Sequence, residues 1–484
     1  MENLIRLVIL SFAIFLSGEL TAQISFYKTY DGSSFDTGEG VVQLPDSSYA
    51  ITGGSGAFSI NSGQAYIMLT DSTGEHLWTK SFGGNGSEIG RRIFYEDGVG
   101  FTVVGTTNST DDGRYNFYYL RTDELGNLIE EKNFGTSNWE QLWDAVKLPD
   151  GGLIMVGESE GEETAMKDIY IARVDDQGDT IWTKTISTGV DDAAKAVDIL
   201  NDTTVIIGGY RYDGSKSNAA LISMHINGTE NWTNFYPGTV DNAKINDLSI
   251  YDNNIYCAGE ITLPGHSDLD WWLWKADDEG NDIDELVGEF DRYDGLSALC
   301  VKDDNIYIGL QSDSDFYNTF PIGVDAFVLK FHIDLWYNGL SQSYSGVNSD
   351  LFNQMMETID GGVMMAGTCG QDRVEASLST SVMAIKIGPG DEVTNVADLG
   401  NDLVSIENND EISDVKIYPN PSSDFLHLEG IKDDFSVQII SNIGETVFEA
   451  ENSSIIDIRS FSEGVYLLRL TVNDTVSFAR IIKR

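Results

Sequence analysis

Apolar and polar residues alternate along most of the chain in short runs that turn residues separate. The segment 143–187 is typical, since its runs WDAVKLPD, GGLIMVGE, DIYIARVD and DTIWTKTIS each alternate with a period near two. That period belongs to a pleated strand with one buried face. The tetrapeptides PDGG and DDQG have the composition of tight hairpin turns. The pattern therefore predicts four strands joined by two tight turns and one longer loop.

This four-strand unit recurs along the chain. A strand that ends in glycine returns about every fifty residues, at Gly54, Gly105, Gly157, Gly208, Gly259, Gly309 and Gly367. Repeats of this length and strand content predict either a β-propeller or a stacked solenoid.

The two ends of the repeat region discriminate between these architectures. The last unit has three strands and then runs into PGDEVTNVADLGNDL, which has no strand pattern. The missing strand, ISFYKTY, lies at Ile24–Tyr30, before the first complete unit. A ring closed by pairing its first strand with its last unit leaves no exposed sheet edge, whereas a solenoid has no use for a borrowed strand. We therefore predict an all-β fold, a seven-bladed β-propeller over residues 23–388 that the N-terminal strand closes.

Large aromatic residues mark one position of the predicted fourth strand, at Phe26, Trp78, Trp182, Trp232 and Trp336. We interpret them as packing between blades, because large rings fill such interfaces well. The alternative interpretation is a stacking platform for sugars.

The charge balance changes the list of possible partners. Lysine and arginine total 29 against 78 acids, which gives a net charge of −49. Such a field repels nucleic acids and anionic lipids and favours cations or basic partners, so we expect no nucleic-acid partner. The three cysteines, Cys257, Cys300 and Cys369, fit neither a zinc site nor a redox pair. We expect them to be buried thiols.

The first 22 residues have the pattern of an export signal. Arg6 precedes the apolar run LVILSFAIFL, and small residues stand before Gln23. We predict a signal peptide over residues 1–22. The later apolar runs are too short to cross a bilayer as a helix, so we expect no transmembrane segment.

Residues 414–484 form a second region with short alternating strands and turn glycines, which predict a small Ig-like β-sandwich. This region resembles the type A C-terminal sorting domain of the type IX secretion system of Bacteroidetes. The residues that carry the resemblance are Tyr418, Pro419, Asn420, Pro421, Gly444, Gly464, Val465 and Tyr466. The resemblance implies contact with the type IX secretion machinery, passage across the outer membrane, and removal of this domain. It also implies that the propeller is then anchored at the cell surface or released.

Residues 389–413, between the two regions, are acidic and weakly apolar. This composition is typical of a linker without a core of its own. We interpret the segment as a cleavable linker between the propeller and the sorting domain.

Two polar series fall on the side of the predicted propeller that carries the longer loops. At the start of the innermost strands, aligned positions hold Asp36, Glu140, Asp192, Asn242 and Asp350. Carboxylates around a channel mouth attract a hard cation such as calcium or a basic group, so Asp36, Glu140, Asp192 and Asp350 are candidate ligand-binding residues. The alternative is a set of solvated residues at strand starts. The second series begins the third strands and is interpreted as turn caps: Gln64, Asn116, Asp168, Asn218, Asp270 and Asp325.

Long loops on a rigid scaffold are common binding sites. The histidines are scattered, and the sequence has no nucleophile elbow or phosphate-binding loop. Our main hypothesis is therefore non-catalytic binding of a glycan or protein at the long-loop side, with no cofactor implied besides calcium. One alternative is a polysaccharide-active enzyme with two carboxylates at the channel mouth. Another is a structural surface protein, which would carry apolar patches on its blade rims.

Overall fold

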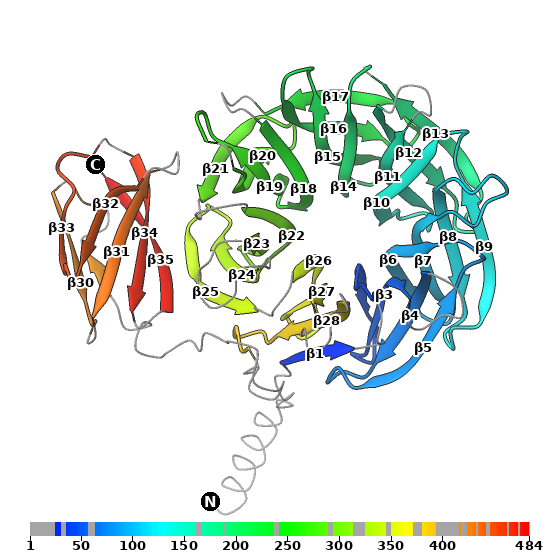
Figure 1. Ribbon diagram of the computed structural model, residues 1–484, viewed down its shortest axis with the longest axis horizontal. Helices are drawn as coiled ribbons and strands as arrows, with labels where there is room; N and C mark the ends of the chain where they lie inside the picture. The colour runs from blue at the N-terminus through cyan, green and yellow to red at the C-terminus, as the bar shows by residue number, and fades with distance from the viewer. Residues whose placement is uncertain are drawn as a thin grey trace, which may run out of the picture.

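The computed structural model (Figure 1) describes the chain from Ser25 onward with gaps. The described residues are 25–30, 35–56, 63–160, 166–187, 189–236, 242–266, 268–288, 294–312, 325–344, 350–370, 380–393, 416–418, 422, 424–431, 434–441, 446–461, 464–472 and 475–483. The predicted signal peptide and most of the predicted linker lie outside these ranges.

Seven four-stranded antiparallel sheets stand around a common centre as the blades of a propeller (Figure 1). The innermost strands of blades 1 to 7 are β2 (Gly40–Gln43), β6 (Glu88–Glu96), β10 (Trp139–Lys147), β14 (Asp192–Asn201), β18 (Asn242–Tyr251), β22 (Asp294–Lys302) and β26 (Leu351–Glu357). The second strands are β3 (Tyr49–Ser55), β7 (Gly100–Thr107), β11 (Leu153–Glu160), β15 (Thr204–Tyr212), β19 (Asn254–Thr262), β23 (Asn305–Ser312) and β27 (Val363–Gly370).

The outer half of each blade follows the same order. The third strands are β4 (Gln64–Thr70), β8 (Asn116–Thr122), β12 (Lys167–Val174), β16 (Ser217–His225), β20 (Asp270–Asp277), β24 (Asp325–His332) and β28 (Thr380–Ile387). The outermost strands of blades 1 to 6 are β5 (His76–Phe82), β9 (Leu128–Phe134), β13 (Thr180–Ile186), β17 (Glu230–Phe235), β21 (Asp282–Gly288) and β25 (Tyr337–Tyr344).

Blade 7 takes its outermost strand from the other end of the propeller. Strand β1 (Phe26–Tyr30) pairs antiparallel with β28, in a register that sets Phe26 opposite Lys386 and Tyr30 opposite Val382. Hydrogen bonds between Asp36 and Thr380 continue this junction, at 3.1 Å from Asp36 N to Thr380 O and 2.9 Å from Thr380 Oγ1 to Asp36 O. The predicted seven-bladed propeller and its closure by the N-terminal strand are confirmed.

Glycines of the second strands lie against the inner strand, although in blades 1 and 4 the closely approached glycine is the neighbour of the one that the spacing marks. In blade 3 the pairing of β10 with β11 shifts register between Leu142 and Asp144, where Gly157 is the partner of Leu142. A Cβ at Gly157 would lie 2.0 Å from the carbonyl oxygen of Gln141. Five of the other blades have a glycine with the same close approach, namely Gly53, Gly105, Gly209, Gly259 and Gly367. The glycine is therefore required because the bulged inner strand presses against the second strand.

Replacing Gly157 with alanine is expected to lower the free energy of unfolding by about 1–3 kcal/mol, because the added methyl displaces backbone rather than a side chain. Chemical denaturation of both chains measures the difference. Gly113→Ala measures the cost of backbone strain alone for comparison, since Gly113 has a positive φ of 73° and a Cβ there would meet no atom within 4 Å. An equal stability of the Gly157→Ala chain and the unmodified chain would contradict the close approach.

The side chain after the bulge ties neighbouring inner strands together. Asp144 accepts a hydrogen bond from Val197 N of the next blade at 2.8 Å and pairs with Arg92 Nε of the preceding blade at 2.6 Å. In blade 7 the corresponding Gln354 accepts a hydrogen bond from Val41 N of blade 1 at 2.7 Å, across the point where the ring closes. The innermost strands thus form a hydrogen-bonded inner ring.

The blades also pack through their outer strands. The ring of Trp78 on β5 covers Gly126 in the turn before β9, where the positive φ of 71° and a Cβ 2.8 Å from the ring both require glycine. The same contact joins Phe26 to Gly74, Trp182 to Gly228 and Trp232 to Gly280. These fourth-strand aromatics therefore pack between blades, as interpreted from their spacing.

The C-terminal region has two sheets. One contains β29 (Lys416–Tyr418), β30 (Phe425–Glu429) and β33 (Ile455–Asp457). The other contains β31 (Phe435–Ser441), β32 (Thr446–Glu451), β34 (Gly464–Val472) and β35 (Thr475–Lys483). Apolar side chains from both sheets, such as Leu426 and Val437, share one core.

The residues that carry the sorting-domain resemblance fall partly in these sheets. Tyr418 ends β29, Gly464 begins β34, and Tyr466 is buried in β34. The predicted motif residues Pro419, Asn420, Pro421 and Gly444 lie outside the described residues.

Candidate functional site

The carboxylates predicted at the channel mouth lie at the start of the innermost strands. Glu140 is the second residue of β10, Asp192 is the first residue of β14, and Asp36 and Asp350 lie just before β2 and β26. All four side chains are buried. Two further members of this series, Glu88 and Asp294, are the first residues of β6 and β22 and were not identified from the sequence. The spacing was sufficient to find them, because each is one repeat from a neighbour.

Each of these side chains contacts groups of its own blade or of the adjoining loop. Glu140 accepts hydrogen bonds from Ser159 Oγ on the neighbouring strand at 3.1 Å and from Thr136 Oγ1. Asp36 accepts one from Ser55, and Asp192 pairs with Arg211 Nε at 3.4 Å. Asp350 accepts a hydrogen bond from Gly370 N at 3.2 Å. Within the described residues, no three side chains of His, Cys, Asp or Glu are grouped so that they can hold a metal ion.

The residues of the second polar series lie at or next to the start of the third strands, as expected. They are paired with residues at or next to the end of the second strands, which lie beside the carboxylates and form a polar row across the blade with them. Ser55 on β3 is paired with Gln64, as Thr107 on β7 is with Asn116. The backbone at the strand starts reaches the loop of the preceding blade, since Glu140 N donates to Tyr115 O at 2.8 Å. This polar row fixes the loops of the long-loop side in place.

The bulges place a different set of side chains toward the centre of the ring. In six inner strands the extra residue of the bulge is Arg91, Trp143, Lys195, Asn246, Ser297 or Asn353. A bulge turns its extra side chain away from the regular alternation. These six residues are all partly exposed. Because neighbouring blades cover both faces of each sheet, the exposed side chains of the inner strands face the axis of the ring.

Three adjacent bulge residues contact one another. The Arg91 guanidinium carbon lies 4.8 Å from the ring centroid of Trp143, and Lys195 Nζ lies 3.2 Å from it. Both contacts are within the range of a cation–π interaction. Arg91 also pairs with Glu39 through Nη1 at 2.6 Å. The three side chains come from blades 2, 3 and 4, so the closed ring brings them together.

Second and third strands add further charges at the same place. Lys167 Nζ lies 2.7 Å from Glu158 Oε1, whereas Lys195 Nζ lies 3.9 Å from Glu158 Oε2. Lys244 pairs with Glu260 at 3.0 Å. We call the set Arg91, Trp143, Glu158, Lys167, Lys195 and Lys244 the axial cluster.

Several polar atoms of the axial cluster are buried without a hydrogen bond. Arg91 Nε, Trp143 Nε1 and Glu158 Oε2 have no hydrogen-bond partner in the described protein. Such atoms are uncommon because an unsatisfied buried polar group costs about 1–3 kcal/mol. Three of them in one cluster indicate a place prepared for a polar ligand or water.

The charges in the axial cluster perturb one another. Burial lowers the pKa of Lys195 to about 7, and repulsion from Lys167, Arg91 and Lys244 acts in the same direction against the attraction of Glu158. Burial also opposes the charge of Lys167, but the hydrogen bond and attraction of Glu158 raise its pKa overall. Lys195 is therefore the least stabilised cation of the group.

Cations elsewhere in the propeller have an evident structural use. Lys80, Lys132 and Lys184, at one position of the outermost strands, donate to carbonyl groups in the turn of the next blade, at 2.6, 2.8 and 3.0 Å. They join blades at the side of the tight turns. Lys195 makes no such hydrogen bond in the described residues, and its Nζ lies instead over the ring of Trp143 at 3.2 Å and 3.9 Å from Glu158 Oε2.

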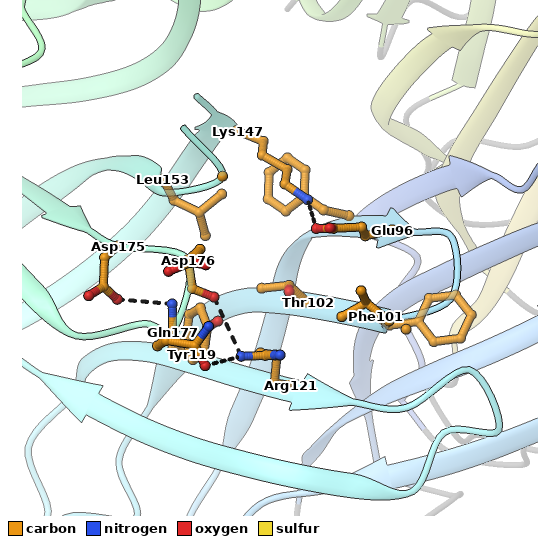
Figure 2. A pocket seen from close by; sticks show the side chains of 14 residues that line it. Glu96, Phe101, Thr102, Tyr119, Arg121, Lys147, Leu153, Asp175, Asp176 and Gln177 are labelled. Carbon is orange, nitrogen blue, oxygen red and sulfur yellow. Dashed lines mark hydrogen bonds and ion pairs between the residues drawn. The ribbon is translucent and has the colours of Figure 1, made fainter. Parts of the chain in front are cut away.

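A cavity of about 160 Å³ lies between blades 2 and 3, near the tight turns (Figure 2). Its two cations have partners, since Lys147 Nζ lies 2.9 Å from Glu96 Oε2 and Arg121 Nη1 donates to Gln177 Oε1 at 2.8 Å. Because these polar groups satisfy one another, the cavity belongs to the contact between blades and is a weaker candidate than the axial cluster.

An exposed aromatic pair lies on the long-loop side. Trp139 is 45% exposed, and its ring centroid lies 5.5 Å from that of Tyr115 in the preceding blade. Trp139 and Trp143 are on the same strand, β10, and four residues of strand span about 13 Å. Strand β10 thus presents one tryptophan at the long-loop side and another at the axis.

The axial cluster was not predicted from the sequence. Its signal is the spacing of Arg91, Trp143 and Lys195, which are separated by one repeat each, but their residue types differ from blade to blade. A series recognised by residue type, as the carboxylates were, does not include them.

The fold and the C-terminal sheets define an exported β-propeller with its own sorting domain. Residues 416–484 match the family described as "Secretion system C-terminal sorting domain". This match establishes the type IX sorting domain expected from the sequence and indicates export to the cell surface or the extracellular space. In the part of the chain that the structure describes, no helix is long and apolar enough to cross a membrane.

Solved structures with similar folds share little sequence with the chain. A puromycin hydrolase variant is 12% identical, with 74% of this chain and 52% of that chain covered and a TM-score of 0.46. The WD40 β-propeller domain of Doa1 is 10% identical, with 75% of this chain and 97% of that chain covered and a TM-score of 0.42. The third structure is the extracellular domain of a protein described as a "putative hybrid two component system" of B. thetaiotaomicron. It is 10% identical, with 96% of this chain and 59% of that chain covered and a TM-score of 0.44. The chain thus spans little more than half the length of two of the three.

No curated protein sequence matches the chain. The propeller assignment therefore rests on the strand pairing of this chain, and the site on its own side chains.

Proposed function

We propose that the exported propeller binds a glycan along strand β10, from the long-loop side to the axis of the ring. The observation that carries this proposal is the pair of partly exposed tryptophans on β10, each held against a neighbouring blade. Trp139 contacts Tyr115, and Trp143 lies beneath Arg91 and Lys195. Aromatic faces with polar groups beside them suit the apolar faces and hydroxyl groups of sugars.

The alternatives have less support. A polysaccharide-cleaving enzyme needs two carboxylates facing each other across the ring, whereas Asp36, Glu140 and Asp192 are engaged with their own blades. A structural surface protein needs apolar patches on the rim. The described outermost strands carry few exposed apolar residues, two on β9 (Leu128 and Ile129) and one each on four others: Leu77, Ile181, Phe235 and Ile283. Scattered residues of this kind are ordinary on a soluble surface.

Replacing Trp139 with alanine is expected to weaken glycan binding by about tenfold or more, because the substitution removes a stacking surface at the long-loop side. A glycan array with the chain of residues 23–484 identifies the ligand, and titration calorimetry with the best ligand then compares the two chains.

The matched control is Trp336→Ala, which removes a tryptophan of the outermost region that stacks on His332. This variant should bind like the unmodified chain. Absence of binding to every glycan, or equal affinity of the Trp139→Ala chain, would contradict the proposed function.

A further inference from the structure

We propose that the axial cluster binds an anionic group of the glycan, either a uronate carboxylate or a sulfate ester. This inference rests on the proposed function and names the class of sugar that the same site takes. The ligand anion would lie against Lys195 Nζ and the Arg91 guanidinium, which are partly exposed, beside the buried Trp143 Nε1.

The first argument is the balance of donors and acceptors. Arg91 Nε and Trp143 Nε1 are buried N–H groups without an acceptor in the described protein. Lys195 Nζ has the ring of Trp143 at 3.2 Å and the distant ion pair with Glu158 at 3.9 Å, and no hydrogen bond from it is described. Unsatisfied donors therefore outnumber unsatisfied acceptors, since Glu158 Oε2 is the single acceptor in the same state. A group that supplies acceptor oxygens satisfies this arrangement.

The second argument is the pairing of charges. Arg91 has Glu39, Lys167 has Glu158, and Lys244 has Glu260 as a carboxylate partner within 3.0 Å. Lys195 lies 3.9 Å from Glu158, which already pairs with Lys167 at 2.7 Å. A bound anion completes the missing pair. In a chain of net charge −49, such an uncompensated cation at a partly exposed position is the exception.

The third argument is geometric. Arg91 and Lys195 come from blades on either side of blade 3 and lie within 4.8 Å and 3.2 Å of the Trp143 centroid. One anionic sugar held against this ring is therefore in reach of both cations. Strand β10 leads from this point to Trp139, so neighbouring sugars of the same chain extend toward the long-loop side.

Anion binding at this place depends on pH. The groups that face Lys195 are Arg91 on β6, Glu158 on β11, Lys167 on β12 and Lys244 on β18. The pKa of Lys195 near 7 in the free protein rises when an anion binds, because the anion stabilises the ammonium form. Binding then takes up a proton, so affinity is highest below pH 7 and falls by up to about tenfold per pH unit as the pH rises above it.

Titration calorimetry with three probes tests the inference: an oligogalacturonate, a carrageenan oligosaccharide that carries sulfate esters and no carboxylate, and a neutral malto-oligosaccharide. We expect an anionic probe to bind at least about tenfold more tightly than the neutral one. We also expect Lys195→Gln to remove most of this preference, and Lys195→Arg to retain a preference that no longer changes between pH 6 and 8.5. The anionic probe that binds more tightly identifies the carboxylate or the sulfate as the ligand group.

Lys80→Gln is the matched control, because it removes the same charge from an outermost strand, where Lys80 binds a turn carbonyl. Its affinity should equal that of the unmodified chain. Equal binding of neutral and anionic probes, or no effect of Lys195→Gln, would overturn the anionic site while leaving the proposed glycan binding intact. Absence of binding by the unmodified chain to the glycan array and to all three probes would overturn both the anionic site and the proposed glycan binding.

Discussion

Deletion of residues 23–30 is expected to abolish the cooperative unfolding of the propeller. The deletion removes β1, which leaves the backbone groups of β28 unpaired and uncovers the core around Phe26, Tyr49 and Met364. The loss of Phe26 alone is expected to cost about 3–5 kcal/mol, and the open sheet edge promotes association between chains. Differential scanning calorimetry and light scattering measure both effects.

A rearranged chain tests whether the loss of cooperative unfolding comes from the open ring or only from the shorter chain. Phe26 is paired with Lys386, so the start of β1 lies beside the end of β28, where residues 388–392 already form a turn. Inserting residues 25–30 after residue 392 in the deleted chain therefore supplies β1 as the second strand of a hairpin. This chain should regain cooperative unfolding. An unchanged melting curve after the deletion alone would contradict the role of β1.

Asp144→Ala is expected to lower the free energy of unfolding by about 3–5 kcal/mol, because it leaves a buried arginine without its counter-charge. Asp144 contacts Arg92 Nε at 2.6 Å and accepts a hydrogen bond from Val197 N at 2.8 Å. The side chains of Asp144 and Arg92 are only 7% and 13% exposed. Urea denaturation followed by tryptophan fluorescence measures the change.

Two further substitutions locate the origin of this effect. Asp144→Asn keeps an acceptor for Val197 N and removes the charge, so its cost should be smaller than that of Asp144→Ala. Asp112→Ala breaks the exposed pair of Asp112 with Arg114, at 3.8 Å, and should cost much less than Asp144→Ala. Similar values for Asp144→Ala and Asp112→Ala would contradict the importance of the buried pair.

The propeller architecture was predictable because the features that indicate it do not depend on the folded state. The repeat length, the glycine at the end of the second strand and the misplaced segment Ile24–Tyr30 are all visible as sequence. The sorting domain was recognisable from its own motif residues. The reason for the repeat glycine was not predictable, because the carbonyl oxygen of Gln141 approaches Gly157 only through the bulge.

The candidate site was less predictable, for a related physical reason. A bulge changes the phase of the alternation at a place that residue type does not mark, so Leu142 and Asp144 are both buried while Trp143 faces the axis. The contact of Trp143 with Lys195 joins two blades and depends on the curvature of the whole ring. For the carboxylates, residue type did not indicate burial beside a polar residue of the neighbouring strand, as Glu140 is beside Ser159.

The shared seventh blade also sets the order in which the molecule matures. Blades 1 to 6 each take their four strands from continuous sequence, so they are able to form one after another as the chain emerges. Blade 7 instead needs Phe26–Tyr30 from the beginning and Thr380–Ile387 from the end. Blade 7 is therefore completed last, once nearly all of the propeller is available. Until strand β1 pairs with β28, the ring remains open between blades 7 and 1.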